Sequence, residues 1–572
     1  MRRLLIPLIA LFLTWAGPAA GQALDVSTWT VVSPDEALRA TVLLDNGVPY
    51  YRVRSGDQQI VAPSRLGVVL ADGDTLGVGM DVVAVERAAR DTTWTQPWGE
   101  VAHVHDHHRE LRLRLQSRTT GRRMDLIFRV FDNGMGFRYA WPEQPNLGRF
   151  RIMDELTGFR FAANPQAWWI RAYQWNRYEY LYEESPLSAA GYALHTPLTM
   201  AFPDGGPYVA VHEAALVDYA GMSLRRTSPT AFQADLAPWS TGVRVYAEAP
   251  HRSPWRTLLV NDTPGGLITN YTVLNLNEPN ALGDVSWVEP SKYIGIWWAL
   301  HLGEWTWGDG PDHGATTAHT RRYIDFAAEH GFEGVLVEGW NVGWNSDWTG
   351  DGRAFSFVEP YPDYDLQSLA AYARAQGTRL IGHHETGGGA PHYEAQMDTA
   401  YALMNDLGVK AIKSGYVDWG MHFPRVTAPG DTAREWNYGQ YMVNHYQRTV
   451  ETAAEHRIAL NIHEAVKGTG LRRTYPNLHD SRGRPRAGVQ LALGRRQRAR
   501  PRAHARLHPH ARWANGLHAR HLRPRRRERQ RQRRAHHPGR AARPLRRPLQ
   551  SAADGSRPPA QLPASHGRLP VH

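Results

Sequence analysis

The chain of 572 residues contains no cysteine. Disulfide bonds therefore do not contribute to its stability, and lipid attachment through a cysteine is excluded. After residue 21, no segment offers about twenty consecutive apolar residues, which is the length that a membrane-spanning helix needs. The end of the chain is also poor in acidic residues: residues 479–572 contain 25 arginines, no lysine and three acidic residues. We therefore expect a protein that lacks disulfides and transmembrane helices and concentrates its positive charge in one segment.

The net charge of the whole chain is misleading as a guide to its partners. The formal net charge is +11, but residues 479–572 carry +22 and residues 1–478 carry −11. The part of the chain that has the composition of a folded protein is therefore acidic. This charge argues against nucleic acid or an anionic membrane surface as the main partner.

The first residues have the pattern of an export signal. Two arginines precede an apolar run from Leu4 to about Trp15, and small residues follow at positions 19–21. This pattern predicts a signal peptide over residues 1–21, with cleavage just before Gln22. We expect the mature protein to be secreted or periplasmic.

Residues 22–290 have the pattern of an antiparallel β-protein. Apolar and polar residues alternate in short segments, and Asn46-Gly47 and Asn133-Gly134 lie between two such pairs of segments. An Asn-Gly pair flanked by period-two segments is a strong hairpin signal. We therefore predict a large N-terminal β-sandwich domain over residues 22–290.

The spacing of apolar residues along the chain changes after residue 290. Short, continuously apolar runs occur at residues 293–300, 334–340, 379–385, 411–417 and 458–465. Such runs are typical of strands covered on both faces, and the segments between them have helical spacing that ends before Gly377 and Gly408. Alternating strands and helices predict parallel βα units. We predict a (β/α)8 barrel domain over residues 291–478 that is truncated after five or six strands.

Polar residues gather at the ends of these predicted strands. They are Glu338, His383, His384, Glu385, Lys413, His463 and Glu464. In a parallel barrel the carboxyl ends of the strands share one rim, so these side chains should form one site. Paired carboxylates at such a rim suit acid/base hydrolysis of a glycosidic bond.

Each residue also has a structural interpretation. Glu338 could cap a helix, the paired histidines could be satisfied core residues, and Lys413 could form an ion pair. The motifs HHE and IHE leave a metal hydrolase open as an alternative, although HHE lacks the histidine spacing of a helical zinc site. The convergence of two carboxylates with several donors favours a functional site.

Three long segments resemble glycoside hydrolase family 97. They begin with PSKYIGIWWALHLGEW at residue 290, HHETGGGAPHYEAQ at residue 383 and IALNIHEAVKGTG at residue 458, and the resemblance covers residues 24–478. The family comprises calcium-dependent α-glucosidases and α-galactosidases with an N-terminal β-super-sandwich and a (β/α)8 barrel. The resemblance implies this fold and an oligosaccharide or small glucoside as the substrate.

The resemblance also implies roles for individual residues. Glu385 and Glu464 match the general bases of the inverting members, and Glu464 and Glu179 match calcium ligands. Sugar-binding positions match four residues: Glu338, His383, Lys413 and His463. Retaining members have an aspartate nucleophile at the position of Gly415, so the resemblance implies an inverting α-glucosidase here.

Residues 479–572 depart from the resemblance. The family has further strands there, together with another calcium ligand and the general acid. The same nucleotides read one base later permit two long peptides that match the family in the correct order. We therefore interpret this segment as a disordered product of a reading-frame slip, which removes the general acid and impairs activity. A genuine arginine-rich arm for nucleic acid is the alternative. Alternative functions are a catalytically dead carbohydrate-binding protein and an α-galactosidase.

Overall fold

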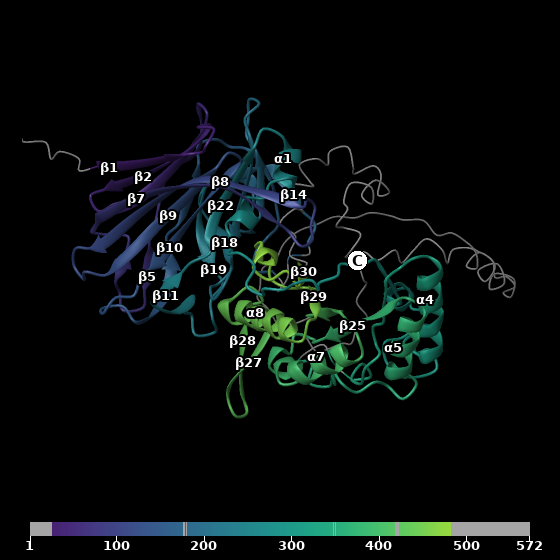
Figure 1. Ribbon diagram of the computed structural model, residues 1–572. Coiled ribbons are helices and arrows are strands. Elements are labelled where there is room, and N and C mark those ends of the chain that lie inside the picture. Colours follow the sequence, from purple (N-terminus) through teal and green to yellow (C-terminus); the bar gives the residue numbers. More distant parts are fainter. Residues whose placement is uncertain are drawn as a thin grey trace, which may run out of the picture. The chain divides into compact units, whose positions relative to one another are not determined.

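The computed structural model describes residues 26–481, except for residues 175–177, 179, 347, 349–350 and 418–422. The predicted signal peptide and all but the first three residues of the predicted tail lie outside the described residues. A mostly β N-terminal region is followed by an α/β region (Figure 1). Within the described residues, no helix has both the length and the apolarity needed to cross a membrane.

Two large antiparallel sheets and one small one form the N-terminal region. The first has the order β1 (Val26–Val32), β2 (Leu38–Asp45), β3 (Val48–Ser55), β4 (Gln58–Arg65), β12 (Gly158–Phe161), β19 (Ala231–Leu236), β18 (Met222–Ser228) and β15 (Ala193–His195). The second has the order β14 (Glu183–Pro186), β13 (Gln166–Trp169), β16 (Leu198–Ala201), β17 (Tyr208–Ala214), β22 (Trp255–Asn261), β10 (Gly134–Trp141), β9 (Arg123–Phe131), β8 (His103–Ser117) and β7 (Met80–Thr95), and β21 (His251–Arg252) pairs with β10. The small sheet contains β20 (Val245–Glu248), β11 (Arg149–Glu155), β5 (Val68–Leu70) and β6 (Thr75–Leu76).

Side chains from the two large sheets share one core. The ring of Tyr51 on β3 lies 4.7 Å from that of Phe137 on β10, and Phe128 on β9 lies 5.1 Å from Phe137 between ring centroids. All three side chains are fully buried. Because alternate residues of each strand face this core, the pattern of period-two apolarity produces the sandwich.

Both predicted Asn-Gly hairpins are present. Asn46 and Gly47 join β2 to β3 with positive φ angles of 47° and 78°. In the second hairpin the turn is one residue earlier than predicted, because Gly134 is already paired with Phe131. A Cβ atom on Gly134 would lie 2.9 Å from the carbonyl oxygen of Leu258, so close backbone packing also requires glycine there.

The α/β region contains a six-stranded parallel sheet. Its order is β23 (Tyr293–Gly295), β24 (Gly334–Leu336), β25 (Arg379–Glu385), β26 (Ala411–Gly415), β29 (Ala459–Ile462) and β30 (Leu478–Ser481). The hairpin β27 (Phe423–Ala428) and β28 (Asp431–Glu435) lies between β26 and β29 in the chain. Strand order follows chain order, as repeated βα units require.

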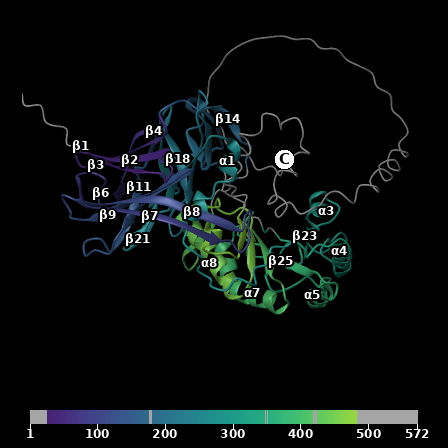
Figure 2. The ribbon, with the colours of Figure 1, turned by 45° about the horizontal axis from the view of Figure 1, so that its top comes forward.

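Helices connect the strands of this sheet and pack against it (Figure 2). The helices of this region are α3 (Trp297–His301), α4 (Thr317–Glu329), α5 (Leu366–Ala375), α6 (Ala390–Glu394), α7 (Met397–Asp406) and α8 (Gln440–Glu455), with the 3-10 turn η2 (Leu471–Arg473). Helices α1 (Pro264–Ile268) and α2 (Thr272–Asn275) and the 3-10 turn η1 (Leu187–Ala189) precede β23, and both helices contact strands of the N-terminal region. Gly377 and Gly408 follow α5 and α7 with φ angles of 74° and 76°, so both predicted helix ends are confirmed.

Several boundaries differ from prediction: strands β24, β26 and β29 are shorter than the apolar runs at residues 334–340, 411–417 and 458–465. The predicted strand over residues 293–300 ends at Gly295, and helix α3 begins at Trp297. A short apolar run does not by itself distinguish a buried strand from a buried helix. In addition, the last parallel strand extends to Ser481, three residues past the predicted limit of the domain.

Candidate active site

The predicted residues Glu338, His383 and Lys413 lie together. Glu338 follows β24, and its Oε1 atom lies 2.5 Å from Nζ of Lys413 on β26 and 3.7 Å from Nε2 of His383 on β25. The register pairs His383 directly with Lys413, so both side chains lie on the same face of the parallel sheet. The structure therefore brings together residues that are 75 positions apart in the chain.

Burial and charge set the protonation of this cluster. Burial raises the pKa of Glu338, but Lys413 and then His383 outweigh this effect and lower its pKa to about 2. Burial lowers the pKa of Lys413, and the Glu338 carboxylate more than compensates, so that the pKa of Lys413 is raised. The cluster is thus an ion pair at neutral pH. Burial also lowers the pKa of His383 to about 4, which leaves its imidazole neutral.

Glu385 ends β25 in a buried position. Its Oε1 atom accepts hydrogen bonds from the backbone N–H groups of Gly387 at 2.8 Å and Val417 at 3.1 Å. Burial and then the neighbouring carboxylate of Glu464 raise the pKa of Glu385 to about 8. A carboxylate with a raised pKa is a stronger base than an ordinary one, which suits proton transfer near neutral pH.

Gly415 has no side chain, and the carboxylate of Glu385 occupies the space that a side chain at position 415 would fill. A Cβ atom at position 415 would lie 2.0 Å from Oε2 of Glu385, closer than any real contact. The register pairs these two residues on neighbouring strands. A side chain at position 415 and the present position of Glu385 therefore exclude each other.

Glu464 and His463 follow β29 on the next strand of the sheet. Oε2 of Glu464 accepts a hydrogen bond from the backbone N–H of Tyr416 at 3.2 Å, so Glu385 and Glu464 bind consecutive N–H groups of one segment. Glu464 has a left-handed φ angle of 56°, an unusual conformation for a residue other than glycine. His463 is buried, and its backbone N–H donates to the carbonyl of Ser414 at 2.8 Å.

His384 faces the other side of the sheet. Its Nδ1 atom lies 3.1 Å from the hydroxyl oxygen of Tyr393 on α6, and its ring stacks on Tyr401 of α7. Successive residues of a strand point to opposite faces, so His384 packs against the helices while His383 and Glu385 point away from them. His384 is therefore a core histidine, as the structural interpretation predicted, but it is only partly satisfied: within the described residues its buried Nε2 atom has no hydrogen-bond partner.

Sequence reasoning missed two polar residues near this cluster. Trp307, in the loop after α3, donates a hydrogen bond from Nε1 to Oε2 of Glu338 at 3.1 Å. Asn461 is paired in register with Lys413 on the same face of the sheet. Asn461 interrupts an otherwise apolar strand, a signal that could have identified it. No strand-end rule could have identified Trp307, since it comes from a loop.

A buried chain of charges fixes the segment that follows Glu464. Lys467 lies 2.7 Å from Glu213 on β17, Glu213 lies 2.5 Å from Arg256 on β22, and Arg256 lies 2.6 Å from Glu155 on β11. All four side chains are at most 1% exposed. Two positive and two negative groups alternate, so each buried charge is compensated. The backbone carbonyl of Gly468 also accepts a hydrogen bond from His212 on β17, at 3.0 Å.

The predicted calcium ligands are only partly described. Glu179 lies outside the described residues. Glu464 is half-buried and carries a hard carboxylate oxygen, the donor type that Ca²⁺ prefers. Burial and then the carboxylate of Glu464 raise the pKa of Glu385, so a cation bound here would offset the repulsion between the two carboxylates.

Comparisons with known proteins identify the class of protein to which this chain belongs. Residues 31–279 match the family described as Glycosyl-hydrolase 97 N-terminal, and residues 297–483 match Glycoside hydrolase 97. A family 97 enzyme from Pseudoalteromonas sp. strain K8, solved with acarbose, is 43% identical with a TM-score of 0.77, over 80% of this chain and 69% of that chain. The class of protein is thus a glycosidase. The chain belongs to glycoside hydrolase family 97.

Two curated relatives are more distant. A "Retaining alpha-galactosidase" of Bacteroides thetaiotaomicron is 23% identical over 80% of this chain and 67% of its own length. A "Probable retaining alpha-galactosidase" of Streptomyces bingchenggensis is 25% identical over 84% of this chain and 68% of its own length. The Pseudoalteromonas enzyme has also been solved as a variant with panose. The structural neighbour therefore binds oligosaccharides, and the two curated relatives carry the names of retaining enzymes.

Proposed function

We propose that this chain has the site of an α-glucosidase that hydrolyses oligosaccharides or small glucosides with inversion. The observation that carries the proposal is the pair Glu385, at the end of β25, and Glu464, just after β29: they bind consecutive backbone N–H groups of the segment that follows β26, the strand between them. Hydrolysis of a glycosidic bond requires one group to activate water and another to protonate the leaving oxygen. We assign the activation of water to Glu385 and Glu464, because the segment after β26 holds both carboxylates close together and the family resemblance places general bases at these positions.

We assign sugar binding to Glu338, His383, Lys413 and His463. Glu338 and Lys413 form a rigid ion pair, which leaves further lone pairs and N–H groups for sugar hydroxyls. Within the described part of the chain, Nδ1 of His383 has no hydrogen-bond partner although it is buried. A buried polar atom of this kind is energetically costly unless a ligand satisfies it. This fits a hydroxyl group of a bound sugar.

The proposal that the reaction inverts the anomeric configuration rests on Gly415. The family resemblance places the nucleophile of retaining members at this position, and a glycine has no carboxylate to attack the anomeric carbon. The clash between a Cβ atom at position 415 and Glu385 supports the same assignment. The names of the two curated relatives favour the alternative, an α-galactosidase that retains configuration.

We propose that the six-stranded sheet is the first part of a (β/α)8 barrel whose remaining strands and general acid are replaced by residues 479–572. All but three of these residues lie outside the described part of the chain. Loss of a general acid lowers rates by about 10² to 10⁴. The chain as given should therefore have little activity, and its second candidate function is a carbohydrate-binding protein that no longer catalyses.

We propose that Ca²⁺ is bound by Glu464 and Glu179. A bound cation would offset the negative charge of the two carboxylates and favour their ionised forms. Export to the periplasm or the medium is proposed from residues 1–21 alone. The calcium proposal rests on the resemblance and on the donor chemistry of Glu464.

The catalytic proposal is tested with the gene resequenced around the codon for Leu478 and expressed in both frames. With p-nitrophenyl α-glucoside, we expect activity from the corrected frame, and proton NMR of the first product should show the β-anomer. Glu385→Gln and Glu464→Gln should each lower kcat by about 10² to 10⁴, the usual contribution of such a group. Glu329→Gln on α4, where the carboxylate is 78% exposed, is the matched control and should leave kcat unchanged.

The outcomes separate the alternatives. An α-anomeric product would establish retention, and faster cleavage of p-nitrophenyl α-galactoside would establish an α-galactosidase; both results together would establish the retaining α-galactosidase instead. Maltose binding by calorimetry without turnover in the corrected frame would identify a binding protein. Full activity of Glu385→Gln would remove the proposed role of this residue.

A further inference from the structure

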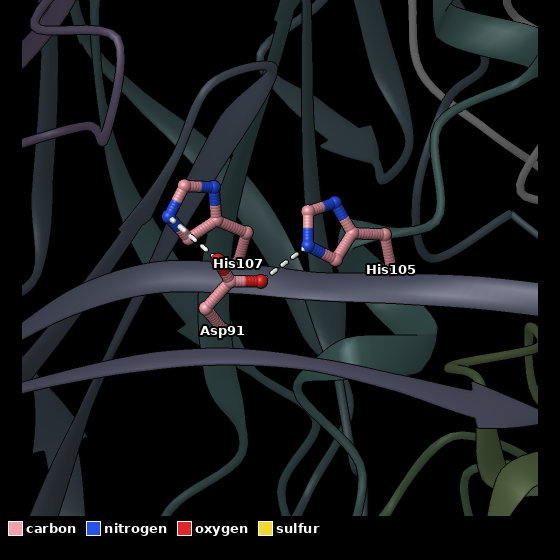
Figure 3. Close-up of side chains that lie close together, drawn as sticks. All are labelled: Asp91, His105 and His107. Atoms are coloured by element: carbon pink, nitrogen blue, oxygen red, sulfur yellow. Dashed lines mark hydrogen bonds and ion pairs between the residues drawn. The ribbon is translucent and has the colours of Figure 1, made fainter.

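A group of metal-binding side chains lies on the N-terminal region and takes no part in the proposed catalysis. Strands β7 and β8 form a long antiparallel arm, residues 80–117, at the edge of the ten-stranded sheet. Asp91 on β7 and His105 and His107 on β8 each direct one ligand atom into a common space, and these atoms all lie within 4.8 Å of one another. Figure 3 shows both imidazole rings turned toward the carboxylate of Asp91.

The geometry of the group follows from the strand pairing. Asp91 is directly opposite His107, and His105 is two residues away on the same face of β8. Nε2 of His105 lies 2.6 Å from Oδ1 of Asp91, and Nε2 of His107 lies 3.9 Å from Oδ2. The two imidazole rings are stacked at 5.3 Å, so both nitrogens reach the same point.

The backbone holds these ligands in place. The pairing of β7 with β8 is regular from Ala84 to Thr95, and its one bulge lies before that stretch. The carbonyl of His105 accepts a hydrogen bond from Nδ2 of Asn275 on α2 at 2.8 Å, and Trp94 donates to the same asparagine at 2.9 Å. A cation would therefore meet side chains whose backbone positions are already fixed.

The local charges favour a cation. Arg90, the nearest cationic neighbour in sequence, lies on the opposite face and pairs with the buried Asp106 at 3.4 Å. Arg90 therefore does not compete with the two histidines for the carboxylate of Asp91. Its side chain is 68% exposed and those of His105 and His107 are 57% and 37% exposed, so a hydrated metal ion has direct access.

We propose that Asp91, His105 and His107 form a binding site for a first-row transition-metal dication, with Zn²⁺ as the first choice. Two imidazole nitrogens and one carboxylate oxygen are a common ligand set for Zn²⁺, and water completes the coordination at an exposed site. Ca²⁺ prefers oxygen donors and is a poor match for two imidazoles. The site is therefore distinct in chemistry from the calcium site proposed at Glu464.

The site has a structural consequence for the arm. Its tip contacts the segment after Glu464: Nε1 of Trp98 donates to the carbonyl of Pro476 at 2.6 Å, and Glu100 pairs with Arg472 at 2.6 Å. A metal ion bridging β7 and β8 would cross-link the two strands that carry this tip. Zn²⁺ should therefore raise the unfolding temperature of the protein.

The test is calorimetric titration of the full chain with ZnCl2, followed by thermal unfolding. The chain has 28 histidines, so the informative quantity is the difference between variants. We expect Asp91→Asn and His107→Ala each to weaken one equivalent of Zn²⁺ binding by more than about tenfold, since loss of outer-shell partners alone costs about 10- to 100-fold. His103→Ala is the matched control, because His103 lies on the same face of β8 but outside the group.

We expect Asp91→Asn and His107→Ala each to lose one equivalent of bound Zn²⁺. The rise in unfolding temperature that Zn²⁺ causes should also be lost in these two variants. His103→Ala should keep both. All three side chains are on the surface, and circular dichroism of each variant confirms that it folds. Identical Zn²⁺ binding in the wild type and His107→Ala would overturn the proposal. An equal loss in His103→Ala, or displacement of the bound equivalent by CaCl2, would overturn it as well.

Discussion

Glu338 illustrates how single residues in this site depend on their neighbours. Its carboxylate is buried, a position that ordinarily favours the neutral acid. The ammonium group of Lys413 at 2.5 Å reverses this preference and keeps the acid ionised. Neither residue would be tolerated in this position without the other, so their pairing is part of the fold as well as of the proposed sugar-binding site.

A stability measurement across pH tests this pairing. The folded-state pKa of Glu338 is about 2, below its ordinary value of 4.5, so its contribution is present above about pH 4.5 and is lost as the pH falls toward 2. At pH 7, Glu338→Gln should lower the free energy of unfolding by about 3 to 5 kcal/mol, because it leaves Lys413 buried and unpaired. Urea unfolding at several pH values should show this difference shrinking below pH 4.5.

A matched variant controls for the effect of low pH on the stability of the whole protein. Glu329→Gln on the surface of α4 should show no comparable pH-dependent difference, since a surface charge contributes little. A Glu338→Gln difference that stays constant from pH 7 to pH 3 would contradict the ion pair as its source.

At the scale of elements, the loop after β29 is fixed by the N-terminal region. Lys467 inserts between β-strands, and its Nζ also donates to the backbone carbonyl of Met222 at 2.5 Å. Glu464 is three residues before Lys467 and has a left-handed backbone conformation. The buried charges at Glu213 and Arg256 therefore help to position a proposed catalytic carboxylate without contacting the substrate.

Lys467→Met tests this positioning. Removal of the ammonium group leaves Glu213 with only Arg256 as an oppositely charged partner, and we expect a loss of about 3 to 5 kcal/mol in the free energy of unfolding. Urea unfolding followed by tryptophan fluorescence measures it. The double variant Lys467→Met/Glu213→Gln should recover part of the loss, because it removes the uncompensated carboxylate.

The control for this prediction is Lys292→Met, since Lys292 is exposed. Its effect should stay within about 0.5 kcal/mol, as is usual for surface substitutions. Equal effects of the two lysine substitutions would show that the buried charge network does not stabilise the loop.

At the scale of the whole molecule, the proposed calcium ligands Glu179 and Glu464 come from the N-terminal and the catalytic regions of the chain. A cation bound by both would link the two regions in the folded state but not in the unfolded one. Ligands that bind only the folded state raise its stability by mass action. Calcium should therefore affect the protein as a whole as well as the site.

Chelation tests this link in the frame-corrected enzyme. Treatment with EDTA should lower both the unfolding temperature and the rate of glucoside hydrolysis, and CaCl2 should restore both. Because EDTA also removes Zn²⁺, the experiment is repeated in the variant His107→Ala. Recovery with ZnCl2 alone, or no response to EDTA, would contradict the calcium proposal.

Much of this architecture was predictable from local patterns. The Asn46-Gly47 turn, the glycines after α5 and α7 and the parallel strands from β24 to β29 follow from periodicity and turn chemistry, which act over a few residues. The strand-end rule also found Glu338, His383 and Lys413, because parallel strands end at a common edge. The same rule did not separate His384 from His383, since the face of each residue depends on the position of the helices.

The sequence by itself therefore determined the family, the β-rich N-terminal region with parallel βα units after it and the positions of the polar strand ends, because these depend on short-range periodicity and on residue types. Only the tertiary structure decided which of them meet. The 2.5 Å ion pair of Glu338 with Lys413, the space at Gly415 that Glu385 fills and the burial of Lys467 against β17 depend on contacts between distant segments. Protonation follows from the same contacts, since burial and neighbouring charge, which shift each pKa, arise only when the chain has folded.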